Sequence, residues 1–506
     1  MRFLIDFFLK NFYAWVMAGL VVYIFSGLAF CQLLSADACN YLNIAQNIAH
    51  HKGFVISYNS AQIFNTLYYP IWPYYQFLYP LFCSLFIAHG GIIGVIKVNV
   101  VLFAVNAAII FYVIQKLIPT RLNILFLLYL VFSTNVYLSA IYPWTEQLHF
   151  LCFILTFMAF LKYAHNQKAL VLLGFLNSVL LLLRESHSFI ILGYLLFILM
   201  GGLPIQGRIK SLVSFITGVL LFYVPYQWWC YGSTHAFYPQ NAKGSIIFSM
   251  SGYTNRVIYD ISKVGPQLTL SPFFTIEHMI NIKKHISDIL HQMSAFMIPC
   301  FFYYLLPEQK RKDGGLVGLA FCQSLTGILG FSLSFYMFDY FDAIRYSMVH
   351  FILISIAGWY CLYQGLAISA SRVWRTIMVI VLVVLVLPLS IQFFDNREAL
   401  LRNPRWVSLP YEKDLFAAYQ WIDNNLPPEA LIASDERQEA YLMHRPFVNV
   451  PEGKAFTCEN LSRFQKIYAP DYYLLSDKIL GTCLEPANYS VIFVNHHLRL
   501  LKSKTS

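Results

Sequence analysis

The sequence contains few charged residues: they make up 12% of its 506 residues, whereas an ordinary soluble chain carries about a quarter. Hydrophobic residues account for 58%, and the mean hydropathy is +0.57. Segments this apolar need lipid rather than water as their solvent. The composition therefore excludes an ordinary soluble protein and indicates a protein of the membrane.

A concentrated basic patch is also missing. The formal net charge is +10, but the basic residues are spread over short loops between apolar runs. Nucleic-acid binding needs positive charge gathered on one surface, so no nucleic-acid partner is expected. The topology of a membrane protein explains the net positive charge better than nucleic-acid binding does.

Polar segments have little cysteine. Of the ten cysteines, Cys39, Cys458 and Cys483 fall in polar stretches. The others lie mostly in apolar segments, where a thiol is usually a small buried hydrophobe. An oxidising periplasm would permit a disulfide between Cys458 and Cys483.

Apolar windows long enough, or nearly long enough, to cross a bilayer give about eleven spans, since one span needs about 20 apolar residues. The first, from Phe12 to Leu34, exceeds the apolar region of a signal peptide, which has about 7–15 residues. It predicts an uncleaved helix. The windows begin at Phe12, Ile92, Leu122, Thr145, Ala169, His187, Ser211, Ser294, Leu316, Ile344 and Thr376.

The polar connections between these windows sort by charge. Basic residues such as Arg2, Lys10, Arg372 and Arg375 all fall on one side, which the positive-inside rule assigns to the cytoplasm. The N-terminus is then cytoplasmic and the C-terminus periplasmic. Three long segments lie outside: 35–91, 231–293 and 395–506.

The composition changes past residue 394 to that of a soluble domain of roughly 110 residues. A helix with an apolar face ends at Pro427, and the runs ALIAS, PFVNV, DYYLLS and YSVIFVNH are typical of short strands. The apolar face consists of Leu415, Ala418, Tyr419 and Ile422. We expect a helical transmembrane domain over 1–394 and a small periplasmic α/β domain over 395–506.

The segment SADACNYLNIAQNIAHHKGF, directly after the first window, predicts an amphipathic helix along the membrane surface. Asp37 stands at its N-terminal end, where the helix dipole stabilises an anion. The simplest interpretation is an N-cap aspartate before an ordinary interfacial helix. The residues at helical spacing are Tyr41, Ile44, Ala45 and Ile48.

Four segments, in chain order, resemble the GT-C superfamily of membrane glycosyltransferases. More narrowly, they resemble its family of protein O-mannosyltransferases and lipid A aminoarabinose transferases. They are D-x3-Y-x3-A-x7-G from Asp37, the Tyr79-Pro80 pair, the Arg345-Tyr346 pair, and W-I-x4-P-x2-A from Trp421. The resemblance implies a GT-C-like fold and sugar transfer from a polyprenyl-phosphate carrier.

The resemblance also implies roles for single residues. In the family the aspartate of this loop is regarded as the catalytic base, and Asp37 is the match. A second acidic residue matches Glu146, and Tyr41 becomes a candidate substrate contact. The sequence departs from the pattern at Ala38, where many members carry glutamate, and at Asn40, where some carry a basic residue. No donor-phosphate contact is therefore implied at position 40.

Several further candidates have a structural alternative. Glu146 could serve only as a first-turn glutamate that the helix dipole favours. His149 follows three residues later, and such a pair can bind a divalent cation, although a polar interfacial histidine is the simpler interpretation. Arg184 and Glu185 interrupt an apolar region, so they are functional candidates or partners of one another at a turn. No cofactor is otherwise indicated.

External cations are candidates for binding the lipid phosphate. Arg345 belongs to the pair with Tyr346 noted above, and arginine suits bidentate contacts with phosphate. Lys243 and Arg256 lie in the long external segment 231–293, where solvated charges are common. Loops of this length often bind ligands, so acceptor specificity is expected there.

The predicted reaction is an inverting glycosyl transfer to an acceptor hydroxyl on the periplasmic face of a bacterial inner membrane. One carboxylate base suffices, because the carrier phosphate is already a good leaving group. The acceptor is a lipid, a glycan or a protein, and membrane lipids surround the enzyme. A saccharide flippase or transporter, or a polysaccharide polymerase or ligase, is the alternative. The sequence has no internal repeat of the kind that transporters often show.

Overall fold

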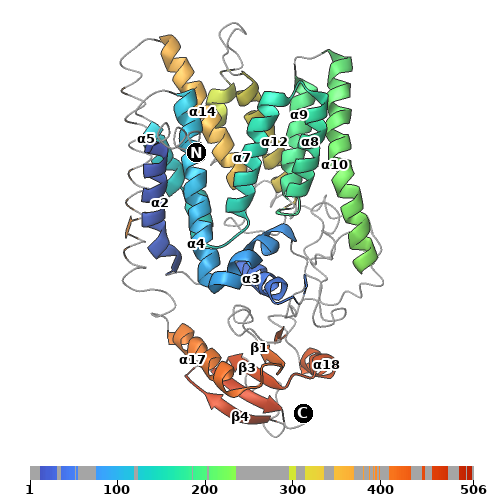
Figure 1. Cartoon of the computed structure of the whole chain (residues 1–506). Coiled ribbons are helices and arrows are strands. Elements are labelled where there is room, and N and C mark those ends of the chain that lie inside the picture. The colour runs from blue at the N-terminus through green and yellow to red at the C-terminus, as the bar shows by residue number, and fades with distance from the viewer. Residues whose placement is uncertain are drawn as a thin grey trace.

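The structure is a computed structural model that describes most of the chain and is mainly helical. A bundle of long helices stands over a small sheet near the C-terminus (Figure 1). The described residues are 12–30, 36–51, 53–54, 76–118, 123–184, 186–201, 204–234, 296–301, 303, 314–334, 347–369, 410–434, 447–450, 458–476, 489–496 and 498–503, with single positions between 376 and 398.

The bundle forms because a helix satisfies its own backbone hydrogen bonds, as lipid requires. Its helices are α2 (Phe12–Phe30), α4 (Leu78–Leu117), α5 (Asn123–Phe132), α6 (Thr134–Ile141), α7 (Glu146–Tyr163), α8 (Gln167–Leu180), α9 (His187–Met200), α10 (Ile205–Thr234), α12 (Gly314–Ser334) and α14 (Met348–Ser369). Within the described residues, two stretches are long and apolar enough to cross a bilayer unaided, Ile93–Leu117 and Ile205–Trp229.

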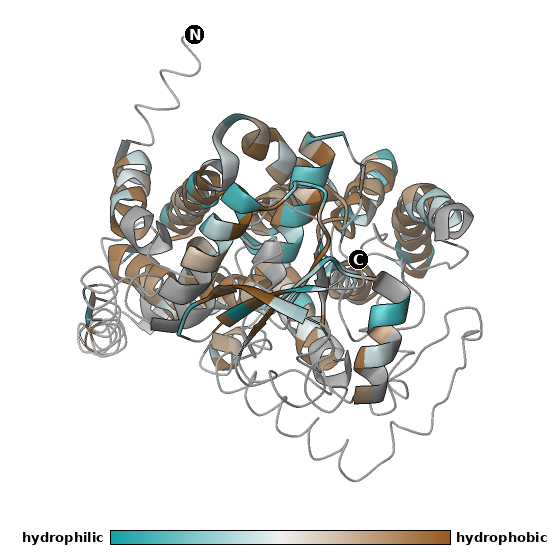
Figure 2. Ribbon diagram, turned by 90° about the horizontal axis from the view of Figure 1, so that it is seen from below, coloured by the Kyte–Doolittle hydropathy of each residue, from teal (hydrophilic) through white to brown (hydrophobic). Residues whose placement is uncertain are grey.

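Large apolar side chains are exposed on the outside of the bundle. Leu155 on α7, Leu172 on α8 and Leu221 on α10 are 60%, 58% and 57% exposed. Figure 2 shows hydrophobic residues over the described helices of the bundle. An apolar surface of this kind is stable in lipid and unfavourable in water, so the chain is a membrane protein.

Helices α8 and α10 pack with their backbones in contact. A Cβ atom at Gly174 would lie 2.1 Å from the carbonyl oxygen of Phe215, and one at Gly218 would lie 2.0 Å from that of Val171. Small residues permit this close approach between membrane helices. The contact fixes the position of α8, the helix that leads into Arg184.

Two helices differ from their predicted bounds. The external segment predicted over 35–91 contains the first part of α4, because Leu78 to Gly90 is helical and packs apolar residues inward. The chain then kinks at Gly91, whose φ of 57° glycine adopts readily. The window predicted from Leu122 forms two helices, α5 and α6, separated by the extended residue Ser133.

Helix α3 (Ala36–Ala49) lies between the bundle and the sheet (Figure 1). Its predicted apolar residues Tyr41, Ile44 and Ala45 are buried. Leu42 and Asn43, on other sides of the helix, are buried as well. A helix with one side exposed at a membrane surface is therefore the wrong description, because α3 is covered on several sides.

The C-terminal segment contains α17 (Pro410–Asn425), α18 (Cys458–Tyr468) and a five-stranded sheet of order β2-β1-β3-β5-β4. Strand β1 pairs in parallel with β2 and β3, and β5 pairs antiparallel with β3 and β4. The strands are β1 (Ile432–Ser434), β2 (Phe447–Asn449), β3 (Tyr472–Ser476), β4 (Tyr489–Val494) and β5 (Leu498–Ser503).

Contacts tie this segment together and to the bundle. Ala418, Tyr419 and Ile422 of α17 are buried in one apolar cluster that also includes residues of the sheet, of α3 and of α4. Cys458 is disulfide-bonded, whereas Cys483 lies outside the described residues. The apolar cluster positions α3 under the end of the bundle.

Candidate functional site

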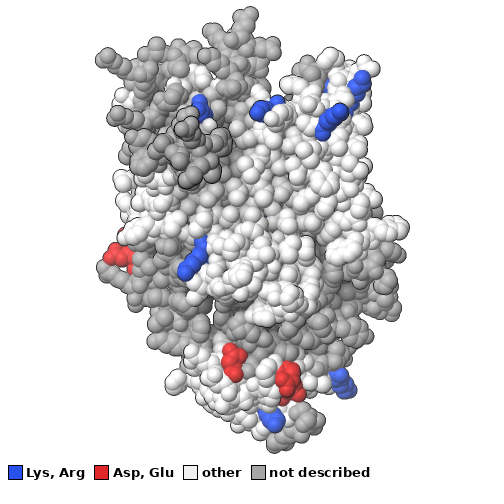
Figure 3. Space-filling view, in the orientation of Figure 1, with Lys and Arg blue, Asp and Glu red and all other residues white. Residues whose placement is uncertain are grey.

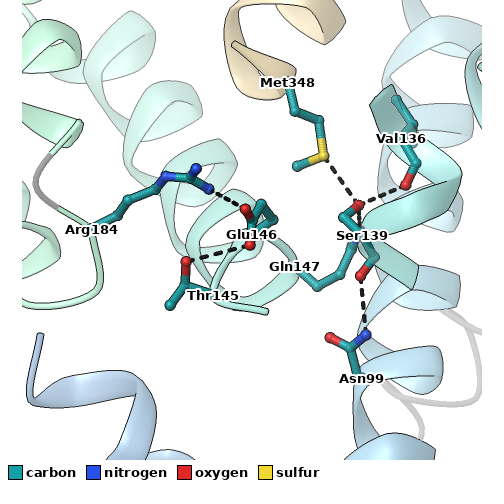
Figure 4. Close-up of polar contacts among 8 residues, drawn as sticks. All are labelled: Asn99, Val136, Ser139, Thr145, Glu146, Gln147, Arg184 and Met348. Carbon is teal, nitrogen blue, oxygen red and sulfur yellow. Dashed lines mark hydrogen bonds and ion pairs between the residues drawn. The ribbon is translucent and has the colours of Figure 1, made fainter. Parts of the chain in front are cut away.

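A buried ion pair joins two of the residues singled out in the sequence. Glu146 is the first residue of α7, and Arg184 lies in the turn between α8 and α9. Arg184 Nη1 lies 2.9 Å from Glu146 Oε1, and the side chains are 7% and 0% exposed. The Thr145 hydroxyl donates to Glu146 Oε2 at 3.4 Å (Figure 4). Desolvating two charges is costly, so such a pair marks a candidate functional site more than a source of stability.

The loop before Glu146 is fixed by a side chain of α4. Asn99 Nδ2 donates to the carbonyl oxygens of Ser139, Ala140 and Tyr142 at 3.0, 3.0 and 2.8 Å. The first two carbonyls lie in the last turn of α6, where the helix itself offers no N–H partner, and the third belongs to the C-cap residue. Asn99 therefore holds the end of α6 and the start of the loop that reaches Glu146.

Gln147, next to Glu146, belongs to a second set of buried hydrogen bonds. Asn106 Nδ2 donates to the Gln147 carbonyl at 2.9 Å and to Gln147 Oε1 at 2.8 Å. Gln147 Nε2 in turn donates to Ser139 Oγ at 2.6 Å, and Ser139 Oγ donates toward Met348 Sδ at 3.2 Å (Figure 4). These contacts join α4, α6, α7 and α14 beside the carboxylate.

The turn that carries Arg184 is tied to the start of α4. The backbone N–H of Leu183 donates to the Leu180 carbonyl, three residues back, at 3.0 Å, and that of Arg184 donates to the same carbonyl at 3.1 Å, so α8 ends in a tight turn. The N–H of Leu78 donates to the Leu182 carbonyl at 3.0 Å. Both partners of the ion pair are thus held by α4, Glu146 through side chains and Arg184 through the backbone.

Tyr79 links helix α3 to the ion pair. The Tyr41 and Tyr79 rings meet edge to face with centroids 5.2 Å apart. Tyr79 also lies close enough to Glu146 for the carboxylate charge to act on its phenol. Tyr41 is therefore buried against another aromatic ring near the site. Tyr79 belongs to one of the segments that resemble the GT-C family, but no sequence signal predicts it in the site.

Asp37 is the second residue of α3, in its first turn. Its side chain lies outside the part of the chain that the structure describes. Several other candidates lie there entirely: Glu185, Lys243, Arg256, Arg345 and Tyr346. The described site therefore unites Glu146, Arg184 and Tyr41 of the predicted residues.

His149 makes a contact that was not predicted. It is 1% exposed, so its side chain is buried within the protein. Its Nε2 lies 2.8 Å from Nδ1 of His187 on α9, and among the described residues no group of three or more His, Cys, Asp or Glu could hold a metal ion. The sequence could not reveal this contact, because the two histidines come from different apolar windows.

Comparison with solved structures identifies the class of fold. The chain has the fold of the GT-C membrane glycosyltransferases. No family model matches the sequence, and no curated protein matches it in sequence. At the identities given below, the likeness shows the fold alone.

Two solved structures illustrate that fold. One is ArnT, a lipid A aminoarabinose transferase, from Cupriavidus metallidurans bound to undecaprenyl phosphate; it is 11% identical, with a TM-score of 0.55 over 98% of each chain. The other is the archaeal oligosaccharyltransferase AglB from Archaeoglobus fulgidus, in complex with an inhibitory peptide and a dolichol-phosphate. It is 10% identical, with a TM-score of 0.53 over 92% of this chain and 70% of that chain.

Proposed function

We propose that this protein is an inverting glycosyltransferase that moves a sugar from a polyprenyl-phosphate carrier to an acceptor hydroxyl. One observation carries the proposal: a buried carboxylate–guanidinium pair, Glu146 and Arg184, lies beside α3 in a chain whose fold matches that of ArnT over nearly its whole length. The ArnT structure holds undecaprenyl phosphate, and the AglB structure holds a dolichol-phosphate. Both support a lipid-phosphate donor here.

In the proposed reaction Asp37 takes the proton of the acceptor hydroxyl. The hydroxyl oxygen attacks the anomeric carbon, and the bond to the carrier phosphate breaks with its electrons. A single displacement from the opposite face inverts the anomeric centre, and it needs one carboxylate base. The first turn of α3 also suits a carboxylate, because the helix dipole stabilises an anion there.

Arg184 is the described cation of the site, and we propose that it stabilises the departing phosphate. Guanidinium groups have five N–H donors in a planar fork, so one group can contact a carboxylate and a phosphate together. Glu146 would hold the fork in position. We propose that Tyr41 contacts the donor and that the external cations Arg345, Lys243 and Arg256, with Tyr346, complete the binding surface.

We further propose that the protein lies in a bacterial inner membrane, with about eleven spans and its C-terminal α/β domain, 395–506, in the periplasm. On the face shown in Figure 3, Lys and Arg lie at the end of the bundle far from the sheet, where Lys116 ends α4 and Lys162 ends α7, and others lie part-way along the bundle and on the C-terminal domain. This distribution supports a cytoplasmic assignment for that end. A reporter active only in the periplasm, fused after Ser506, is expected to be active; an inactive fusion would reverse the topology.

The most informative test of the proposed function is mass spectrometry of the cell envelope. A deletion strain is expected to lack one sugar on lipid A, on the polysaccharide core or on an envelope protein. Restoring the wild-type gene should restore that sugar. If all three fractions keep every sugar under conditions in which the protein is normally made, the transferase assignment is wrong.

A further inference from the structure

Two of the buried histidines inside the bundle, neither with a part in the proposed reaction, lie within hydrogen-bond distance of each other. His149 of α7 and His187 of α9 are 1% and 0% exposed. His187 Nε2 lies 2.9 Å from Oδ1 of Asn177 on α8, and Asn177 Nδ2 donates to the Leu173 carbonyl at 2.8 Å. Polar side chains at this depth are costly, and they are functional candidates by default.

The hydrogen bonds fix the direction of this chain. A carbonyl oxygen only accepts, so the Asn177 amide must turn Nδ2 toward Leu173 and Oδ1 toward His187. Nε2 of His187 therefore carries the proton, and in the neutral ring Nδ1 accepts. That acceptor faces His149 Nε2 at 2.8 Å, so His149 donates through Nε2. Its own Nδ1 is then left with a lone pair.

Burial favours this neutral state of both rings. His149 is buried, and the Arg184 guanidinium acts electrostatically on it, so protonating the imidazole would place a second positive charge close to the first inside the protein. The alternative, in which Nδ1 of His149 carries a proton, requires that second charge or a reversed Asn177 amide. Asn177 and His187 thus hold His149 as an acceptor.

The lone pair on His149 Nδ1 has no hydrogen-bond partner among the described residues. A buried acceptor without a partner is unfavourable, and such atoms often mark the place of a ligand. His149 follows Glu146 by three positions, which puts it on the same face of α7, one turn deeper in the bundle.

We propose that His149 Nδ1 accepts a hydrogen bond from a hydroxyl of the donor sugar and thereby determines sugar specificity. This inference rests on the proposed function. A lone pair repels the oxygens of a phosphate and attracts the O–H of a sugar, so His149 selects the part of the donor that carries hydroxyls. His187 and Asn177 are positioning residues, because they set the tautomer of His149 and touch no substrate.

The proposal also orients the donor. Arg184, a cation, takes the phosphate, and His149, one turn further along α7, takes the sugar. A site that hydrogen-bonds a substrate hydroxyl discriminates strongly against the analogue that lacks it, since its own polar group then stays unpaired. His149 is therefore expected to distinguish sugars that differ at one hydroxyl.

The test compares donors in purified, reconstituted full-length protein. The probes are undecaprenyl-phosphate pentoses and hexoses, with single-deoxy analogues of any sugar that the wild type transfers. In the wild type, one deoxy analogue is expected to raise KM by roughly tenfold, the loss of one hydrogen bond. In His149→Leu the parent donor and that analogue should have equal KM values. Sugar-free undecaprenyl phosphate should inhibit both proteins equally.

A conservative variant separates specificity from folding. The amide oxygen of His149→Asn can occupy the place of Nδ1, so this variant is expected to keep part of the discrimination that His149→Leu loses. If His149→Leu does not fold, the KM values of the single-deoxy donors with the wild type and with His149→Asn still test the role of His149. Equal KM values for all deoxy analogues in the wild type would overturn the role of His149. So would unchanged discrimination in His149→Leu.

The two proposals fail in different ways. A wild type that transfers sugar but shows no hydroxyl discrimination through His149 leaves the transferase assignment standing and removes the specificity role. A loss of inhibition by undecaprenyl phosphate in His149→Leu would show that His149 serves the phosphate instead, which also contradicts the inference. A wild type that neither binds undecaprenyl phosphate nor transfers any sugar overturns both.

Discussion

Replacing Asp37 by asparagine is expected to lower sugar transfer by roughly 10²- to 10⁴-fold, the usual contribution of a general base. Asparagine keeps the size and shape of the side chain and loses only the small stabilisation that the helix dipole gives an anion in the first turn, but it cannot take a proton from an alcohol. Expression and thermal stability should therefore stay near those of the wild type. The measurement is transfer from a polyprenyl-phosphate sugar in reconstituted membranes.

The matched control makes the same chemical change elsewhere. Asp423 is exposed on α17, away from the ion pair, and Asp423→Asn should transfer sugar at the wild-type rate. Undiminished activity of Asp37→Asn would remove Asp37 from the mechanism. Equal losses of transfer activity in both variants would indicate a general effect on folding or reconstitution and not the removal of a catalytic base.

Breaking the buried ion pair is expected to have the largest effect on stability. Glu146→Gln leaves the Arg184 guanidinium buried without its carboxylate, which typically costs about 3–5 kcal/mol. Thermal unfolding in detergent, followed by intrinsic fluorescence, should show a clearly lower Tm. The double variant Glu146→Gln/Arg184→Met removes both charges, and it should unfold at a higher temperature than the single variant.

Sugar transfer by the double variant then distinguishes a structural role of the ion pair from a catalytic one. The double variant is expected to be more stable than Glu146→Gln and still inactive, because no cation is left in the described site for the departing phosphate. A double variant that transfers sugar at the wild-type rate would show that the pair only holds the helices together. A single variant as stable as the wild type would show that the two charges are not coupled.

The sequence predicted the helices better than their irregularities. Hydropathy alone located α7 and α9, since runs of apolar residues leave few alternatives in lipid. It could not predict that α4 begins at Leu78, before the kink at Gly91, because that first part buries its apolar residues against α3 and not against lipid. It also missed the break at the extended residue Ser133, where the polar residues Ser133, Thr134 and Asn135 interrupt the apolar window.

The strands of the C-terminal segment were also predicted in part from the sequence. Four β-rich runs in the sequence correspond to β1, β2, β3 and β4, because their apolar and β-branched residues suit a buried sheet. Strand β5 was not predicted, since LRLLKS mixes basic residues with leucines. Its Leu498 and Leu500 are fully buried because they join the apolar cluster that includes Ala418 and Ile422 of α17.

The site itself was only partly predictable. Glu146 and Arg184 each stood out as ionisable residues in an apolar chain, but their partners in sequence, His149 and Glu185, were the natural candidates for pairing. Helix packing decided otherwise, because it brings the turn after α8 to the start of α7. The hydrogen bond between His149 and His187 is likewise a tertiary contact, without any local signal.

The most direct test of the central claim is whether the protein binds the lipid carrier. Native mass spectrometry of the purified full-length chain with undecaprenyl phosphate should show saturable binding of one lipid. An excess of phosphatidylglycerol should not displace it, and Arg184→Met should weaken it. Equal retention of undecaprenyl phosphate and phosphatidylglycerol, unaffected by that variant, would contradict a polyprenyl-phosphate donor.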